Sequence, residues 1–250
     1  MPTVIFALLT VFAIGVAIYF WRGQQTAVVQ LAAAQARVSR AEQTFEAGNA
    51  AIDSIVSNLA SSLGNPGGIQ ARDMTAILAH VESVIDTLAT EPESYPEVRR
   101  NWAAMYVQLS APYVALGDTK LAVASARKGT DIFRALAAAE PNNDEMQSDV
   151  GLSLEKLAEA LRASGEKSGA LAADRESLDI ARTLSAKEPG NRQFRTDVVL
   201  ALWRLASAGD DPRARLTEAL KILNNMKLAA MLLPAQEMWI EAIAGELSKL

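Results

Sequence analysis

The sequence predicts an all-α fold: an α-solenoid of helical hairpins that follows a single transmembrane helix and a helical stalk. Three observations support this prediction. The first 21 residues carry no charged side chain, the next stretch repeats apolar residues with heptad spacing, and several residue types then recur about every 48 positions. The expected divisions are 1–22 (anchor), 23–44 (stalk), 45–91 (degenerate repeat), 92–140, 141–188 and 189–234 (three repeats) and 235–250 (capping helix).

The composition narrows the class of function. Half of the 250 residues are apolar, and 24 Lys and Arg against 29 Asp and Glu give a net charge of −5. A mildly acidic chain is poorly suited to neutralising phosphates, so we expect no nucleic-acid partner. There is no cysteine and a single histidine, His80, which excludes thiolate chemistry and any catalytic triad that does not include His80. We expect no enzymatic activity, no metal and no cofactor, and a structural or exposed His80.

The charge-free segment has the length of a membrane anchor. Residues 4–21 would span roughly 27 Å as a helix, close to the ~30 Å hydrocarbon core of a bilayer. Tyr19 and Trp21 stand at its end, where aromatic rings favour the headgroup layer, and Arg22 follows. A cleaved signal peptide with a small-residue site at 15–17 is the alternative. The missing positive charge before the segment favours the anchor, with residues 4–21 in contact with lipid.

The flanking charges predict an orientation. Arg22, Arg37 and Arg40 follow the apolar segment, whereas no Lys or Arg precedes it. The positive-inside bias therefore favours a bacterial inner-membrane protein with the repeat domain in the cytoplasm. A periplasmic repeat domain is the alternative.

Apolar residues and one glycine at alternating steps of four and three form a heptad seam over residues 27–59. Its members are Ala27, Leu31, Ala34, Val38, Ala41, Phe45, Gly48, Ile52, Ile55 and Leu59. One interpretation is self-association through residues 27–59 as a coiled coil. The alternative is that the part from Phe45 onward packs as the first helix of the following domain.

An internal repeat is the most informative feature of the chain. Glu-Pro pairs begin at Glu91, Glu140 and Glu188, at spacings of 49 and 48 residues. Further sets share the offset of 48: Tyr106, Leu154 and Leu202; Leu109, Leu157 and Leu205; Leu88, Leu136 and Leu184; Gly117 and Gly165. So many coincidences at one offset indicate a structural period.

Each unit is predicted to contain two helices. The expected ranges are 45–63 with 71–90, 97–116 with 119–139, 149–164 with 168–187, and 193–207 with 213–233. Pro112 predicts a kink, and Asn142, Asn143 and Asn191 are suited to cap the helices that follow them. Asp210 and Asp211 are interpreted as capping residues and not as a metal site. A final helix over 237–250 would place Ile240, Ile243, Leu247 and Leu250 on one face and cover the last repeat.

The repeat resembles that of tetratricopeptide-repeat proteins, in a bacterial variant with a lengthened second helix. The matching residues are Tyr106, Leu109, Ser110, Tyr113, Gly117 and Ala122 in one copy and Leu154, Leu157, Ala158, Leu161, Gly165 and Ala170 in the next. The third copy keeps Leu202, Leu205 and Ala206 and then loses about one turn before Gly209. Ala126 and Asp174 depart from the family pattern, which has an aromatic residue there. The resemblance implies hairpins that stack into a superhelix with a groove lined by first helices.

The resemblance also implies which residues look into that groove. They are Val107, Gln108, Glu155, Lys156, Glu159, Arg162, Trp203 and Arg204. Trp203 and Arg204 are residue types that anchor protein partners, although Trp203 could instead pack on the neighbouring hairpin and the mixed charges could form a solvated face. The expected function is a membrane-tethered scaffold for a protein partner. The alternative is a structural accessory subunit of a larger membrane complex.

Overall fold

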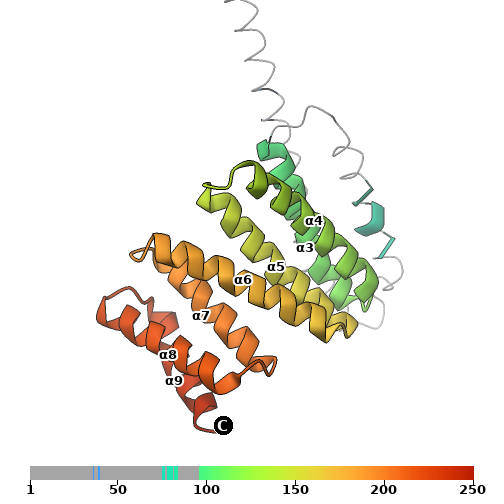
Figure 1. Ribbon diagram of the computed structural model, residues 1–250. Helices are drawn as coiled ribbons and strands as arrows, with labels where there is room; N and C mark the ends of the chain where they lie inside the picture. Colours follow the sequence, from blue (N-terminus) through green and yellow to red (C-terminus); the bar gives the residue numbers. More distant parts are fainter. Residues whose placement is uncertain (1–35, 37–38, 40–74, 77, 81, 84–95) are drawn as a thin grey trace, which may run out of the picture. The chain divides into compact units, whose positions relative to one another are not determined.

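The computed structural model describes residues 36, 39, 75–76, 78–80, 82–83 and 96–250 (Figure 1). All of these residues that adopt regular structure are helical, which confirms the all-α prediction for this part of the chain. The chain divides into two compact units, residues 1–47 and 48–250, and the helices discussed below belong to the second. The predicted anchor, nearly all of the predicted stalk and most of residues 45–91 lie outside the described residues. None of the described helices combines the length and apolar character needed to cross a bilayer.

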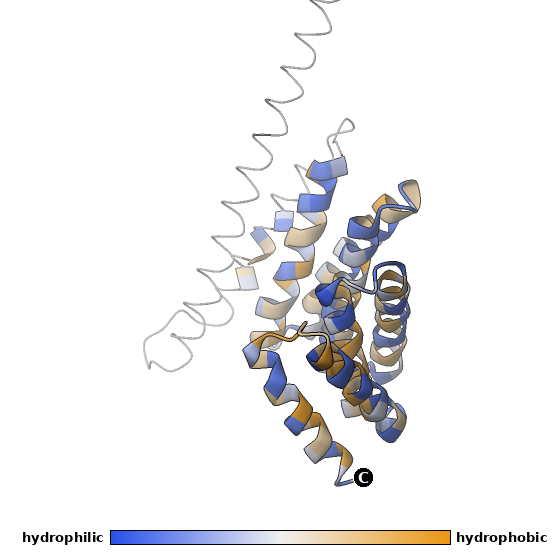
Figure 2. Cartoon of the chain, turned by 90° about the vertical axis from the view of Figure 1, so that its left-hand side faces the viewer, coloured by the Kyte–Doolittle hydropathy of each residue, from blue (hydrophilic) through white to orange (hydrophobic). Residues whose placement is uncertain are grey.

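Residues 96–250 form consecutive antiparallel helices. They are α3 (Pro96–Ala115), α4 (Thr119–Ala139), α5 (Asp144–Ser164), α6 (Lys167–Lys187), α7 (Arg192–Ser207), α8 (Pro212–Leu228) and α9 (Pro234–Leu247). Each helix packs against the next one in the chain, and α3 also packs against α5 (Figure 1). Hydrophobic and hydrophilic residues occupy different sides of these helices (Figure 2), as expected of helices that each bury one face.

Several helix ends differ from the prediction. Helix α5 begins at Asp144 and not at Asp149, because Asn143 caps the chain there. Helix α8 ends at Leu228 and not at residue 233, and Ala230 follows it with a positive φ of 53°, a backbone conformation that helices do not use. The shortening of the third copy is confirmed, since α7 has 16 residues whereas α5 has 21. Pro112 lies inside α3, and the helix continues past it to Ala115.

The turns within the three hairpins share one hydrogen-bond pattern. Gly117, Gly165 and Gly209 adopt φ values of 80°, 86° and 86°, a left-handed conformation that ends a helix and that glycine adopts at low cost. The residue after each glycine donates its N–H to the carbonyl five positions earlier: Asp118 to Tyr113, Glu166 to Leu161 and Asp210 to Leu205, each at 2.9 Å. The recurring glycines of the sequence therefore mark recurring turns.

The links between hairpins repeat as well. Asn143 Oδ1 accepts hydrogen bonds from the N–H groups of Glu145 and Met146 at 3.1 and 3.2 Å, and its Nδ2 donates to Glu140 Oε2 at 2.8 Å. In the next copy Asn191 accepts from the corresponding N–H groups at 3.0 and 3.3 Å and donates to Glu188 Oε2 at 3.0 Å. The Glu of each of these two Glu-Pro pairs therefore ends one helix and holds the residue that caps the next.

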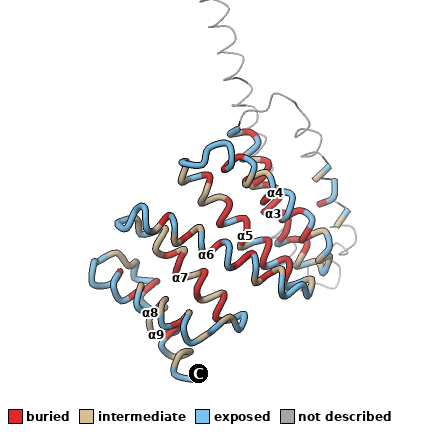
Figure 3. The backbone as a smooth tube through the Cα atoms, viewed as in Figure 1, coloured by how far each residue is buried: buried red, intermediate tan, exposed pale blue. Residues whose placement is uncertain are grey.

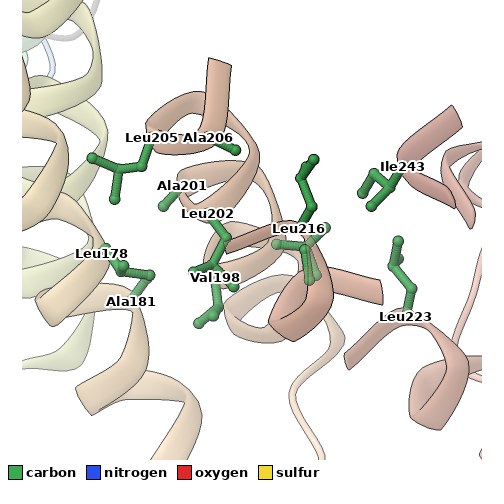
Figure 4. Close-up of a cluster of buried hydrophobic side chains, with 12 residues drawn as sticks. Leu178, Ala181, Val198, Ala201, Leu202, Leu205, Ala206, Leu216, Leu223 and Ile243 are labelled. Atoms are coloured by element: carbon green, nitrogen blue, oxygen red, sulfur yellow. The ribbon is translucent and has the colours of Figure 1, made fainter. Parts of the chain in front are cut away.

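The repeated apolar positions form the core. Tyr106, Leu154 and Leu202 are buried, as are Leu109, Leu157 and Leu205. Figure 3 shows buried residues along the helices α3 to α9. A cluster in the second half of the domain joins Leu178 and Ala181 of α6 and residues of α7 to Leu216 and Leu223 of α8 and Ile243 of α9 (Figure 4). Ile240 and Leu247 pack against this cluster, but Leu250 lies beyond the end of α9 and is 56% exposed. The prediction that Leu250 belongs to the buried face is wrong.

Candidate functional site

A surface pocket of about 330 Å³ lies between the end of α5 and α7. Its lining residues are Arg162, Leu200, Trp203, Arg204, Ser207 and Ala208. Arg162, Trp203 and Arg204 were predicted from the sequence to face a groove. Arg162 lies on α5, and Trp203 and Arg204 lie on α7, the first helix of the next hairpin. The pocket combines two guanidinium groups with an aromatic ring and small or aliphatic side chains, a mixture suited to anchoring a side chain of a protein partner.

Trp203 is held in place by the last helix. Its indole Nε1 donates to Glu246 Oε2 at 3.0 Å, and its ring meets that of Trp239 edge-on, with the ring centres 6.5 Å apart. An edge-to-face pair of this kind restricts both rings. Trp203 therefore packs against α9, the final helix and not a member of a neighbouring hairpin, and it also lines the pocket.

The two arginines of the pocket lie close to a buried carboxylate, and Arg162 hydrogen-bonds to it. Asp174 on α6 is fully buried; its Oδ2 accepts from Arg162 Nη1 at 2.5 Å, and its Oδ1 lies 3.7 Å from Arg204 Nε. Arg204 Nη2 also lies 2.5 Å from Glu155 Oε1. The four side chains form an ion cluster, here called the α5–α7 cluster, that joins helices α5, α6 and α7.

Burial dominates the acid–base behaviour of this region. Desolvation raises the pKa of Asp174 and that of Glu155, while the neighbouring arginines act in the opposite direction. Desolvation likewise raises the pKa of Asp197, whose Oδ1 accepts from Gln193 at 2.8 Å. Each carboxylate therefore sits in a place where its charge is costly unless an arginine stays close.

The remaining predicted groove residues do not line this pocket. Val107 is only 8% exposed and lies at the contact of α3 with Gly129 of α4, so the expectation that it faces an open groove is wrong. Gln108 is exposed on α3. Lys156 and Glu159 are exposed and form an ion pair at 3.0 Å, which is the solvated face that the sequence offered as the alternative.

Sequence reasoning missed Asp174 and three lining residues of the pocket. Asp174 was noted only as a departure from a family pattern, although a carboxylate at a position that is Ala126 one repeat earlier was a signal of a specific partner. Leu200, Ser207 and Ala208 carried no such signal. They line the pocket at and near the end of α7. The shorter length of α7 could be read from the sequence, but the placement of α7 relative to α5 could not.

The other candidate residues have structural partners or lie exposed. His80 is exposed. Asp210 binds Arg175 and Arg215, and these two bonds lower its pKa against a smaller effect of desolvation. Asp211 accepts from the N–H of Ala214 and caps α8, as predicted. Among the residues that the structure describes, no group of three or more His, Cys, Asp or Glu could hold a metal ion.

A second pocket, of about 460 Å³, lies on α4, α5 and α6 and contains none of the predicted groove residues. Arg134 and Glu176, which form two hydrogen bonds with each other, are both in its lining.

In comparisons with known proteins, no family model matches the chain and no curated protein matches it. What the α5–α7 pocket can bind therefore follows from its own residues and distances.

Proposed function

We propose that this protein is a membrane-tethered, non-enzymatic scaffold that binds a protein partner through the α5–α7 pocket of a superhelix of the tetratricopeptide-repeat type. The observation that carries the proposal is the meeting of Arg162, Trp203 and Arg204 in one pocket. Tryptophan and arginine are the residue types that most often dominate the binding energy of protein interfaces. All three are held by contacts within the protein, which lowers the entropy lost on binding.

The repeated turns and caps support the solenoid part of the proposal. Helices that contact mainly their neighbours in the chain, and hairpins joined by recurring glycine turns, are typical of repeat proteins. Such a stack offers its first helices as an extended binding surface. The resemblance to tetratricopeptide repeats in the sequence points the same way.

The tether and its location are part of the same proposal. Residues 4–21 would hold the protein in a bacterial inner membrane with the repeat domain in the cytoplasm, and residues 27–59 would pair two copies. A tether raises the local concentration of the binding site at the membrane surface. Protease treatment of intact spheroplasts tests the location: protection of residues 45–250 supports a cytoplasmic domain, whereas digestion supports the periplasmic alternative.

A structural subunit of a larger membrane complex is the second candidate. It is favoured by exposed apolar side chains near the end of the chain, where Leu228 is 88% exposed and Met238 on α9 is 68% exposed. Large exposed apolar groups are typical of surfaces that meet another protein.

A pocket-blocking variant tests the scaffold proposal. Ser207 is exposed and lines the pocket, so the bulky, uncharged side chain of Ser207→Phe would fill it without removing a buried contact. The full chain and this variant are tagged, extracted in detergent and compared for proteins that co-purify. We expect Ser207→Phe to lose at least about tenfold of the partner, and Ala124→Phe, at an exposed position on α4, to retain it. Equal recovery with both variants would contradict a partner site at this pocket.

A further inference from the structure

We propose that the α5–α7 pocket accepts an acidic side chain of the partner next to an aliphatic one, and that Asp174 is the positioning residue that prepares Arg162 and Arg204 to receive it. This inference rests on the proposed function, because it names the chemistry of the partner at the same site. It follows from three features of the pocket: how the arginines are held, how their charges are balanced, and which apolar groups surround them.

Asp174 lies on the interior side of both arginines: it hydrogen-bonds to Arg162 and forms a longer ion pair with Arg204. Arg162 bonds to one of its carboxylate oxygens through Nη1, and Arg204 approaches the other through Nε. The side chains of Arg162 and Arg204 nevertheless remain 36% and 24% exposed, and both line the pocket. Arg162 is therefore anchored by a hydrogen bond to Asp174 and Arg204 by ion pairs with Asp174 and Glu155, while both side chains also line the pocket. A guanidinium has five N–H donors, so an anchored arginine can still donate to a ligand.

The charge of the α5–α7 cluster indicates the kind of anion. Arg162 and Arg204 balance Asp174 and Glu155, so the formal charges of the four side chains sum to zero. The cluster therefore offers directed N–H donors and little net positive charge. A carboxylate carries one negative charge and can accept two parallel bonds from one guanidinium. A phosphate group carries nearly two charges and gains most where arginines are in excess, so the carboxylate is the better match.

The other lining residues determine which kind of partner side chain can lie beside the acidic one. Leu200, Trp203 and Ala208 lie next to the arginines in the pocket. Trp203 is kept in place by Glu246 and Trp239, so part of its ring is a rigid apolar surface. A partner segment with an Asp or Glu beside an aliphatic residue would satisfy both halves of the pocket. Burial of the aliphatic side chain would supply affinity, and the acid would supply orientation.

Binding of short peptides to the full-length protein in detergent tests this inference. The probes are three dye-labelled peptides that share leucines around a central Asp, Asn or phosphoserine, and fluorescence anisotropy measures their Kd. We expect the Asp peptide to bind at least about tenfold more tightly than the Asn peptide. Equal affinity of the Asp and Asn peptides would overturn the inference, and tighter binding of the phosphoserine peptide would overturn the assignment of a carboxylate.

Variants separate positioning from folding. Arg162→Lys keeps the charge beside Asp174 but loses the planar fork, and we expect it to reduce the preference for Asp over Asn to about threefold or less. Asp174→Asn should reduce the same preference while the affinity for the Asn peptide stays unchanged, a result that unfolding would not produce. Arg127→Gln, at an exposed position on α4, is the control and should keep the full preference. An undiminished preference in Asp174→Asn would contradict the positioning role.

The outcomes also distinguish the two proposals. If the captured partner depends on Ser207 but the peptides show no preference for Asp, the acidic chemistry is wrong and the scaffold proposal stands. If Ser207→Phe retains the partner, the pocket is not the partner site and the scaffold proposal itself is wrong.

Discussion

Hairpins α3/α4 and α5/α6 share a turn type, a register and a buried apolar seam, yet they differ at one pair of positions, which is apolar in the first and charged in the second. Val114 and Ala126 in the first hairpin correspond, 48 residues later, to Arg162 and Asp174 in the second. Ala126 and Asp174 are both fully buried. The same place in the fold therefore holds a methyl group in one hairpin and an ion pair in the other.

A second pair of positions follows the same division. Gly129 and Val107 in the first hairpin correspond to Ser177 and Glu155 in the second. The absence of a side chain at Gly129 lets α4 approach α3 closely and helps bury Val107, whereas Glu155 remains partly exposed and pairs with Arg204. The two hairpins therefore share a backbone path, and the polar residues of the second hairpin supply the ion cluster beside the pocket.

The largest expected effect comes from removing half of the ion pair. Arg162→Val alone would leave Asp174 buried with only the more distant Arg204, and we expect a loss of about 2–3 kcal/mol in the free energy of unfolding. The double variant Arg162→Val/Asp174→Ala copies the first hairpin and should recover to within about 1 kcal/mol of the wild type. Urea denaturation of the full-length protein, followed by circular dichroism, measures both. A double variant as unstable as the single one would show that the two hairpins are not interchangeable.

The close approach in the first hairpin can be broken at Gly129. An added Cβ would lie 2.5 Å from Ala103 O and 2.6 Å from Val107 Cγ2, so we expect Gly129→Ala to lower the free energy of unfolding by about 1–3 kcal/mol. Gly151→Ala is the matched control in α5, because its Cβ would meet Ile180 at 3.5 Å, an ordinary contact. It should stabilise the protein by about 0.5–1 kcal/mol through helix propensity. Thermal melts of both variants test the contrast.

The caps should show where the repeats behave alike. Asn143 and Asn191 make the same hydrogen bonds, so Asn143→Ala and Asn191→Ala should each lower the free energy of unfolding by about 1 kcal/mol. Replacement of each Asn by Asp keeps the acceptor but places a second carboxylate against Glu140 or Glu188, so it should restore only part of this loss. A difference above about 1 kcal/mol between the two alanine variants would mean that the two links are not equivalent.

The smallest effect concerns pH and Asp197 on α7, the first helix of the third hairpin. Burial raises the pKa of Asp197 above its ordinary value of 3.8, so the folded state takes up a proton before the unfolded state does. The contribution of this group to stability is therefore fully present below pH 3.8 and is lost as the pH rises through the folded pKa. Asp197→Asn should raise the free energy of unfolding at pH 7 by less than about 1 kcal/mol and flatten its dependence between pH 4 and 7. An unchanged slope over this range would contradict the effect of burial.

Local chemistry made much of the fold predictable. Gly117 and Gly165 indicate turns because few other residues adopt their positive φ. Pro189 marks the end of α6 because proline has no N–H to continue the helical hydrogen bonds. The apolar positions repeated around Leu157 predicted the buried seam correctly. Each of these signals depends on a few neighbouring residues, so the chain alone contains it.

Positions that depend on a second helix were predicted less well. Val107 was expected at an open surface, and only the approach of Gly129 from α4 makes it buried. The start of α5 is a different case, because its signal is local: the apolar pattern begins at Asp149, but Asn143 already caps the helix from Asp144.

The helices, the glycine turns, the period and a short set of polar residues on the first helices follow from local signals in the chain. Which of those residues meet depends on how the helices pack. Arg162 and Arg204 share a pocket because Asp174 of α6 lies between them, and Trp203 is fixed because α9 presents Glu246 and Trp239 to it. Caps and turns depend on interactions within a few residues of chain. Ion pairs and ring contacts between helices form only where packing brings distant residues together.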